Sequence, residues 1–531
     1  MKTEVITTMI PFVFLVHFTT TTISPSPEPS WPFSLLSISI AVAAITLHFA
    51  VTTRHARGRN GAATTTAAAI PGPRGWPLVG SLPAVSGPLM HRRLAALADA
   101  HGACRLMSLT LGATPVVISS HPDTAREILS GAAFVDRPPK AAARELMFCR
   151  AVGFAPGGGE YWRRLRRAAG AGMLSPRRLT ALGGLRRRVA DGMAWRVAEQ
   201  MESSGEVAMR ALLQRASLES MAGSVLGLEG GAVREELAEM VSEGYELVGT
   251  FNIGDHYYTT PWGPLMDLWG VGPACRRLAA RVRGYFGKII EERRLAGDCH
   301  QRDDLLSYML GLPEDERLED SDVIAVLWEM IFRGVDVVAI LLEWAMARIA
   351  LHPDIQSKAH MEIDAVVGSR PMTDSDISSL HFLQCIVKET LRMHPPGPLL
   401  SWARLAVHDA QVGKHVVPAG TTAMVNMWAI AHDEAVWGDP WAFRPERFQE
   451  RDVSVLGSDL RLAPFGSGRR VCPGRMMGLS TALLWIGRLL QEYEWSPAQP
   501  VRLTECLRLS MEMKHPLVCR AVGRGEGVLT A

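Results

Sequence analysis

Hydrophobic positions recur at helical spacing over most of the chain between His91 and Leu391, and a repeat of three to four residues predicts helices. Shorter apolar or alternating runs near residues 104–120 and 414–426 are typical of strands. The two patterns together predict a mainly α-helical fold with a small β portion. The chain contains no internal repeat, so we expect one large globular unit.

The longest predicted helix spans Asp322–Leu351, with Ser321 as its N-cap and Pro353 just after its end. About thirty residues give roughly 45 Å of helix. Within Leu327–Leu342 the segment is apolar on nearly every side, which predicts burial. Asp336 lies in the middle of this segment, and a buried carboxylate must be paired, protonated or placed beside a cavity.

The N-terminal segment Trp31–Val51 has 21 residues without a formal charge, enough to cross a hydrocarbon core of about 30 Å. Three arginines follow it, at positions 54, 57 and 59, and the positive-inside rule places the rest of the chain in the cytosol. An earlier apolar segment, Val5–Phe18, is either a signal-like region or a second insertion. We therefore predict a membrane anchor at 1–53 (transmembrane about 31–51), a basic and proline-rich linker at 54–80, and a globular domain at 81–531.

Composition narrows the class of protein without identifying it. With 47% hydrophobic residues, 21% charged residues and a net charge of +2, the chain is neither disordered nor a nucleic-acid binder by these measures. Its eight cysteines are scattered without a CxxC pair, which indicates reduced thiols on the cytosolic side. Only Cys472 has surroundings that suggest more than a small buried side chain.

The segment PFGSGRRVCPG, residues 464–474, surrounds Cys472 with glycines and arginines. A cysteine that binds a metal must be a thiolate, which backbone N–H groups at a helix start stabilise. Pro473 suits a first helical turn, and 474–490 is predicted to be helical. Gly466, Gly468 and Gly474 allow close approach of a flat group, and Arg470 supplies a charge for an anionic one. A haem has both properties.

FGSGRRVCPG resembles the cysteine-ligand loop FxxGxRxCxG of the cytochrome P450 monooxygenases, at Phe465, Gly468, Arg470, Cys472 and Gly474. The resemblance implies a cytochrome P450 fold with haem b (iron protoporphyrin IX) as cofactor and Cys472 as the iron ligand. Further matches are KETLR, FRPERF and YWRRLRR. In the family, the residues matching Glu389, Arg392 and Arg447 form a structural triad, and those matching Trp162 and Arg166 reach a haem propionate. Arg404 is a weaker propionate candidate.

Several segments, among them FVDRPPK (134–140) and ELMFCRAVGFAP (145–156), are most similar to plant microsomal members of the subfamily numbered seventy-eight A. That likeness implies hydroxylation of a hydrophobic molecule such as a fatty acid, and a link to growth and organ size. It also implies a single-pass protein of the endoplasmic reticulum membrane that uses dioxygen. The chain has no dinucleotide-binding fingerprint, so we expect electrons from a separate NADPH-dependent reductase.

The central helix departs from the family pattern (A/G)GxDT, because the chain reads RGVDVVA at 333–339. Gly334 and Asp336 are kept as expected catalytic positions, but Val337 replaces threonine and cannot hydrogen-bond. Three alternatives stay open. Ordered water or a substrate hydroxyl replaces the missing group; the enzyme runs partly uncoupled and releases peroxide; or the protein is an isomerase or dehydratase that rearranges a peroxide.

A haem sensor without turnover is an alternative from another class. Phe251–Gly272 argues against it, because its aromatic residues and glycines indicate a membrane-facing lid over an apolar site, although an amphipathic core helix with a turn would have a similar composition. The residues we expect to line the site are Gly334, Ala339, Leu399, Leu400 and Phe148.

Overall fold

The long apolar segment in the middle of the sequence forms helix α14 (Asp320–Leu351) in the computed structural model of the protein. The structure describes residues 69–228, 235–258, 260, 263–297, 302–400 and 403–525. Helix α14 ends where predicted but starts two residues earlier, because the backbone is extended at Glu319, which is the N-cap in place of Ser321. Its largest side chains, Trp328, Phe332 and Trp344, are fully buried, as the pattern predicted.

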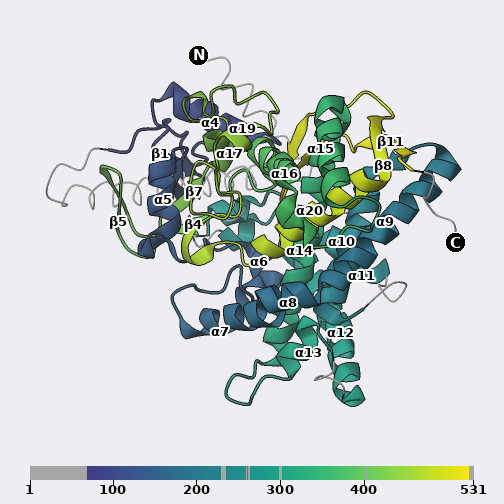
Figure 1. Ribbon diagram of the computed structural model, residues 1–531. Coiled ribbons are helices and arrows are strands. Elements are labelled where there is room, and N and C mark those ends of the chain that lie inside the picture. The colour runs from purple at the N-terminus through teal and green to yellow at the C-terminus, as the bar shows by residue number, and fades with distance from the viewer. Residues whose placement is uncertain are drawn as a thin grey trace, which may run out of the picture. The chain divides into compact units, whose positions relative to one another are not determined.

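Helices make up most of the described chain, which confirms the predicted fold class. Beside α14 they are α3 (Leu82–Val85), α4 (Met90–Ala100), α5 (Pro122–Ser130), α6 (Ala141–Glu145), α7 (Glu160–Ala169), α8 (Pro176–Ala181), α9 (Gly183–Ser204), α10 (Met209–Leu226), α11 (Glu235–Gly249), α12 (Val271–Ala296), α13 (Leu305–Leu310), α15 (Pro353–Val366), α16 (His381–Met393), α17 (Met427–Ala431), α18 (Glu434–Trp437), α19 (Arg447–Glu450) and α20 (Arg475–Glu492). Helices α9, α10, α14 and α20 pack against one another as a bundle (Figure 1). This bundle holds α14 and the start of α20 in fixed positions.

A four-stranded sheet has the order β1-β2-β7-β4. Its strands are β1 (Met107–Leu111), β2 (Thr114–Ser119), β7 (Thr422–Val425) and β4 (Arg404–Leu405). β1 and β2 form an antiparallel hairpin, and β7 joins β2 in parallel. A separate hairpin contains β5 (Ala410–Val412) and β6 (His415–Val417). β1, β2, β6 and β7 fall in the two regions where the sequence predicted strands, whereas β4 and β5 precede the second region.

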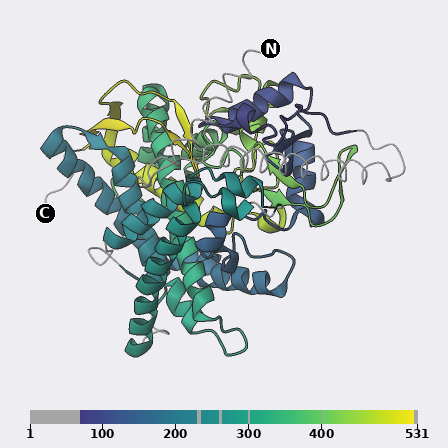
Figure 2. The same ribbon diagram turned by 180° about the vertical axis from the view of Figure 1, so that it is seen from behind.

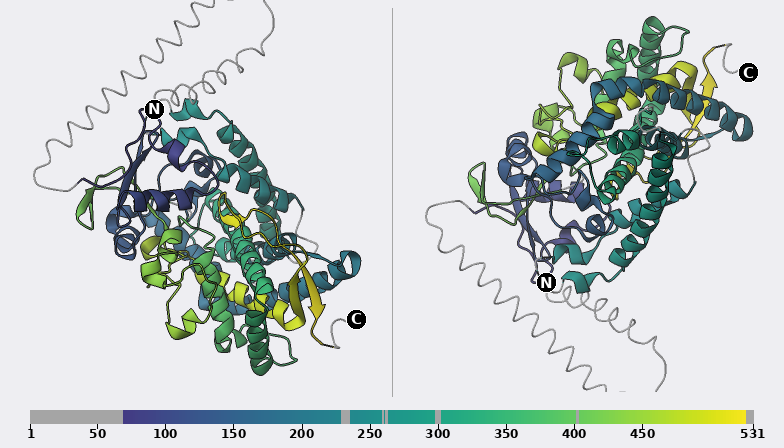
Figure 3. Two further views of the ribbon diagram at one scale, coloured as in Figure 1. Left: turned by 90° about the horizontal axis from the view of Figure 1, so that it is seen from above. Right: turned by 90° about the horizontal axis from the view of Figure 1, so that it is seen from below.

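The C-terminal strands were not predicted. β8 (Tyr493–Pro497), β11 (Val518–Gly523) and β3 (Val207–Ala208) form a sheet in the order β3-β11-β8, and β9 (Glu505–Leu507) pairs with β10 (Met511–Met513). Views from the front and from behind show β8 and β11, in yellow, at the opposite end of the described unit from the purple β1 and β2 (Figures 1 and 2). The views from above and below also show these two groups of strands at opposite ends (Figure 3).

The chain divides into two units, Met1–Thr66 and Ala67–Ala531. Residues 69–80, the end of the predicted linker, contact the globular body, since the Ser108 N–H donates to the Pro71 carbonyl at 2.8 Å. The predicted anchor at 31–51 and the apolar segment Val5–Phe18 lie outside the described residues. Among the helices that are described, none is long and apolar enough to span a membrane.

Candidate active site

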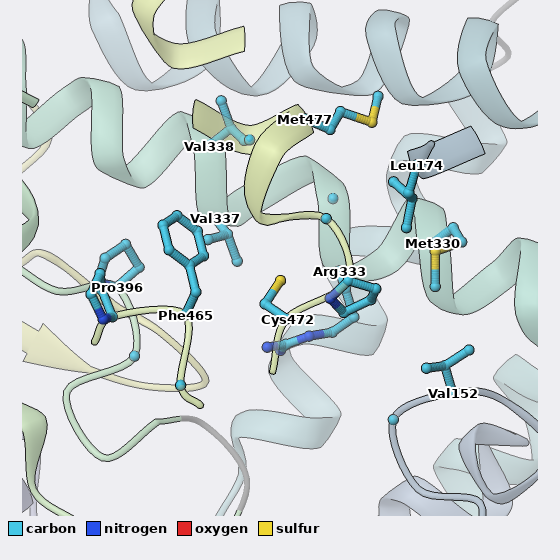
Figure 4. A pocket seen from close by; sticks show the side chains of 18 of the residues that line it. Val152, Leu174, Met330, Arg333, Val337, Val338, Pro396, Phe465, Cys472 and Met477 are labelled. Carbon is cyan, nitrogen blue, oxygen red and sulfur yellow. The ribbon is translucent and has the colours of Figure 1, made fainter. Parts of the chain in front are cut away.

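A cavity lies between α14 and the loop that carries Cys472 (Figure 4). The wall from α14 consists of Glu329, Met330, Arg333, Gly334, Val337, Val338 and Leu341. These positions recur every three or four residues and therefore share one face of the helix. The opposite wall includes Phe465, Gly466, Cys472, Pro473 and Gly474, and α10 adds Ser217, Ser220 and Met221. Most of the lining side chains are apolar, as in a pocket for a hydrophobic ligand.

Cys472 faces this cavity, and Figure 4 shows its sulfur and the side chain of Val337 bordering the same space. The Cys472 N–H donates to the Phe465 carbonyl at 2.9 Å, which closes the loop. Burial raises the pKa of the Cys472 thiol, while a backbone hydrogen bond from Gly474 and the charge of Arg333 act in the opposite direction. A thiolate at this position is therefore costly unless a positive partner such as a metal ion binds it.

The loop glycines do not all serve the purpose we expected. Gly466 and Gly474 line the cavity and have open space where a Cβ would point, so a flat ligand could approach the backbone there. Gly468 is different: it has φ +68°, and a Cβ there would lie 2.3 Å from the Leu129 carbonyl oxygen at the end of α5. Gly468 therefore permits close packing of the loop on α5 and does not line the cavity, contrary to its predicted role.

Positive charge is concentrated around the cavity, whose lining includes Arg137, Arg166, Arg333, Arg404 and Arg470. Burial, with the charges of Arg470 and Arg166 nearby, lowers the pKa of Arg404 to about 9. Burial likewise lowers the pKa of Arg137 well below its usual range. Buried guanidinium groups that repel one another are stabilised by an anionic ligand, and the two propionates of a haem meet this requirement.

Arg470 lies at the cavity, but its hydrogen bonds go elsewhere. Its Nε donates to the Val135 carbonyl at 2.9 Å, Nη1 donates to the Val152 carbonyl at 2.9 Å, and Nη2 donates to the Ala155 carbonyl. These bonds use three of the five N–H donors of the guanidinium, so the role of Arg470 toward an anionic group stays a prediction. The same bonds tie residues 135–155 to the cysteine loop.

Trp162 and Arg166 share a face of α7, as their spacing predicted, but only Arg166 lines the cavity. The indole N–H of Trp162 donates to the Val152 carbonyl at 3.0 Å. The guanidinium of Arg470 lies 4.8 Å from the centroid of the Trp162 ring and that of Arg166 lies 5.4 Å from it. The expected direct contact of Trp162 with a propionate is therefore replaced by an indirect role, in which its ring positions two arginines.

The triad expected from KETLR and FRPERF is present behind the cavity. Arg392 donates to both carboxylate oxygens of Glu389, at 2.7 and 2.9 Å. Arg447 donates to Glu389 at 3.0 Å from the start of α19. Glu389 and Arg392 are fully buried, and none of the three side chains lines the cavity. The triad thus connects α16 to the segment that precedes the cysteine loop.

Asp336 and Val337 are neighbours in sequence but face different surroundings. Val337 lines the cavity, whereas Asp336 lies beside that face and accepts a hydrogen bond from Gln214 of α10 at 3.1 Å. Burial raises the pKa of Asp336 to about 6, against the hydrogen bond from Gln214. Gly334 lines the cavity, but a Cβ there would lie 2.5 Å from Cε of Met221, so this glycine also allows α10 and α14 to pack closely.

Three of the predicted lining residues do not reach the cavity. Ala339 lies off the face of α14 that carries Val337. Phe148 packs against Phe332, with ring centroids 5.2 Å apart. Leu399 belongs to the hydrophobic cluster around β1 and β2. Leu400 and Gly334 do line the cavity. The described residues of Phe251–Gly272 do not. They form two short 3₁₀ turns at Ile253–His256 and Gly263–Met266, and the last two, Val271 and Gly272, begin α12.

The sequence prediction missed two charged residues of α14, Glu329 and Arg333. Glu329 accepts hydrogen bonds from the Gly153 N–H at 2.9 and 3.1 Å, and burial raises its pKa to about 7. Arg333 occupies the position where the family pattern has alanine or glycine. Both lie within the run described as apolar on nearly every side. Their spacing of four residues, on one face of a buried helix, was the signal that could have identified them.

Comparison with known proteins supports the interpretation of the cavity as a haem site. Residues 70–519 match the family described as Cytochrome P450. Cytochrome P450 78A5 of Arabidopsis thaliana is 50% identical over 471 residues, which cover 86% of this chain and 89% of that protein. Cytochrome P450 78A11 of Oryza sativa subsp. japonica is 47% identical over 496 residues, 88% of each chain. Flavonoid 3'-monooxygenase of Arabidopsis thaliana is 33% identical over 470 residues, 84% of this chain and 90% of that protein.

Proposed function

Because the chain belongs to the cytochrome P450 family of haem-thiolate monooxygenases, we propose that it hydroxylates a hydrophobic small molecule, a fatty acid or similar amphiphile, with dioxygen and electrons from NADPH. The observation that supports this most is Cys472, which faces a largely apolar cavity below α14. The isomerase, dehydratase and sensor alternatives become outcomes of the tests below.

The residues around the cavity fit a haem b. Cys472 would bind its iron, and the positive charges of Arg166 and Arg404 would offset its propionates. When bound, haem supplies the iron that activates dioxygen, and a thiolate ligand favours cleavage of the O–O bond. The triad Glu389, Arg392 and Arg447 would keep the loop in place from behind. The apolar face of α14 would hold the substrate and exclude bulk water.

For proton delivery, this chain needs a group that replaces the threonine hydroxyl missing at Val337. A carboxyl and a neighbouring hydroxyl usually share the work, and here Asp336 has no hydroxyl beside it on α14. The carboxyl is hydrogen-bonded to Gln214 and lies off the cavity face. We propose that ordered water or a substrate hydroxyl carries protons past Val337. The protein would then act as a monooxygenase, but it would release more peroxide than an enzyme with threonine at this position.

A separate NADPH-dependent reductase in the same membrane is the proposed electron donor. Support comes from α7, whose Arg166 donates to the Val471 carbonyl at 2.9 Å next to Cys472. The same helix exposes Arg163 and Arg167, which both pair with Glu160. A basic surface so close to the cysteine loop suits an acidic partner.

We further propose that the protein is held in the endoplasmic reticulum membrane by one span at 31–51, with its catalytic domain in the cytosol. An exposed apolar surface, here called the apolar face, supports contact with lipid. It consists of Trp76, Val79, Phe251, Leu265, Leu268 and Trp269. The Tyr257 hydroxyl joins its two segments by donating to the Leu78 carbonyl at 2.9 Å. Large apolar side chains that gather on a surface indicate a membrane or protein contact.

A role in plant growth and organ size completes the proposal, and it rests on the resemblance to the subfamily alone. The test of the chemistry is an absorption titration of the haem-loaded protein with fatty acids of increasing chain length. A shift of the Soret band that saturates, followed by an NADPH-dependent hydroxylated product, is the expected result. Normal binding of carbon monoxide with no shift for any lipid-like ligand would favour the sensor.

A further inference from the structure

Arg333 places a positive charge within the wall of the substrate cavity. It lies on the lining face of α14, one turn before Val337, and Figure 4 shows it in the same cavity as Cys472. Its charge acts on Cys472, Glu329 and Asp336 alike. Arg333 is partly buried, and Glu329 is the other charged side chain on this face of α14. A cation in such a place is costly to remove from water, so packing alone does not account for it.

The other four arginines of the cavity belong to different elements and bind the backbone. Arg470 donates to three carbonyls, and Arg166 donates to the Val471 carbonyl. Arg404 donates to the Ser467 carbonyl at 3.4 Å, and Arg137 donates to the Gly153 and Ala403 carbonyls. These four come from loops, α7 and β4. Arg333 alone among the described lining arginines comes from α14, the wall that faces the substrate space.

The balance of charge leaves room for another anion. Five guanidinium groups line the described cavity, with Glu329 as its one carboxylate side chain. Two haem propionates and an ionised Glu329 would offset three of the five. Burial raises the pKa of Glu329 to about 7, so its share is incomplete near neutral pH. The charge of the Cys472 thiolate would be matched by ferric iron. Among the groups that line the cavity, positive charge therefore remains in excess after the cofactor is counted, while Asp336 and Asp136 outside the lining also attract Arg333 and Arg470.

Hydroxyl groups lie across from this part of α14. Ser217 and Ser220 of α10 line the cavity, and the next residue, Met221, contacts the position of Gly334. The Ser217 side chain is 2% exposed, and its hydroxyl makes no hydrogen bond with any described residue. A buried hydroxyl without a partner is destabilising unless a ligand satisfies it.

We propose that Arg333 binds the anionic headgroup of the substrate, so that the substrate is an amphiphile with a carboxylate or a similar anion and an apolar chain. The inference rests on the proposed function and makes it more specific. The apolar side chains Met330, Val338 and Leu341 would contact the chain, Arg333 would pair with the anion, and Ser217 could donate to it. A bond between two charged groups inside a cavity is strong enough to discriminate against neutral analogues.

The test compares a carboxylic acid with its methyl ester of the same chain length, on full-length haem-loaded protein, by the ligand-induced shift of the Soret band. We expect the acid to bind at least about tenfold more tightly than the ester, the minimum for a hydrogen bond to a charged group. Arg333→Met, which has similar length and no charge, should remove this preference. Arg333→Lys should retain part of it. Met330→Leu, the control on the same wall, should change both affinities alike.

Each outcome bears on a different claim. Equal affinities of the unmodified protein for acid and ester would overturn the role of Arg333 and leave the proposed function intact. Binding of neither would overturn the fatty-acid proposal and this inference with it. Loss of haem from Arg333→Met, measured as the haem-to-protein absorbance ratio, would also overturn it, because Arg333 would then hold the cofactor.

Discussion

Val337 is the residue at which this chain departs most clearly from the family pattern. Its methyl groups line the cavity, and valine resembles threonine in shape while lacking its hydroxyl. Val337→Thr should therefore fit without strain and add an anchor for water. We expect the yield of product per NADPH to rise several-fold and peroxide release to fall, measured together in a reconstituted system.

Val337→Ala is the matched control, because it changes the volume without adding a hydroxyl and should not improve the yield. If Val337→Thr leaves the NADPH-driven yield unchanged and the protein turns over a hydroperoxide equally well in both forms, the rearrangement alternative is favoured over the monooxygenase.

The carboxyl of Asp336 should make stability depend on pH. Burial raises its pKa to about 6, whereas an unfolded aspartate has a pKa of about 3.9. The folded state therefore holds the proton more tightly, and this contribution is complete below about pH 4 and is lost as the pH rises through 6. Asp336→Asn cannot titrate. We compare the free energies of unfolding of the two proteins at each pH. From pH 4 to pH 8 the difference should change by up to about 3 kcal/mol in favour of Asp336→Asn.

Unfolding by denaturant at both pH values, with and without Asp336→Asn, measures this difference, and other titrating groups cancel in the comparison. A difference between the two proteins that does not change with pH would show that the carboxyl keeps an ordinary pKa.

Prediction from sequence worked for single residues when the signal was local. Cys472 was identified because its neighbours are consecutive in the chain, and Glu389 with Arg392 because one helical turn separates them. The bonds of Arg470 to the carbonyls of Val135 and Val152 connect segments more than 300 residues apart. No local pattern contains such contacts, so the sequence could place Arg470 near the site but not determine what it binds.

Among the elements, α16 and α19 are joined by the buried triad. Removing one member of a buried ion pair leaves an uncompensated charge, which costs about 3–5 kcal/mol. Arg447→Met should therefore lower the free energy of unfolding by that order and reduce haem incorporation, since the cysteine loop follows α19. Thermal unfolding and the haem-to-protein ratio measure the two effects.

Lys358→Met is the control for that experiment. Lys358 and Glu446 form an ion pair of 2.6 Å at the surface, and exposed pairs contribute little. We expect almost no change in stability or haem content. Equal effects of Arg447→Met and Lys358→Met would contradict a structural role for the triad.

Among the elements, the longest helix was predicted most closely. Helix α14 has a sustained pattern over 32 residues, so its position was predicted to within two residues. The strand β3 has two residues and pairs with β11, which follows it by about 310 positions. So short a strand is stabilised by its partner and not by its own sequence, which is why β3 was missed. β8 and β11 were missed although they are as long as β1 and β2, so length does not account for them.

For the whole molecule, the sequence predicted one globular unit after the N-terminal region. Contact of this unit with a membrane is a further prediction. A chain that starts at Ala67 lacks the predicted span but keeps the apolar face. We expect it to bind lipid vesicles, and Leu265→Glu or Trp269→Glu to weaken the binding about tenfold, because each removes a large apolar contact. Sedimentation with vesicles measures the bound fraction.

Leu295→Glu is the matched control, since Leu295 on α12 is 88% exposed and is not part of the apolar face. It should bind vesicles as the unmodified chain does. Equal binding of all these variants would rule out the apolar face as the contact with lipid.

The central claim is that the sulfur of Cys472 binds haem iron as a thiolate. The most direct measurement is the absorption spectrum of the reduced protein with carbon monoxide, for the unmodified chain and for Cys472→Ser. We predict that the unmodified protein gives the red-shifted Soret band of a thiolate-bound haem and that Cys472→Ser loses it. A protein that binds no haem, or a Soret band that is unchanged in Cys472→Ser, would contradict the account.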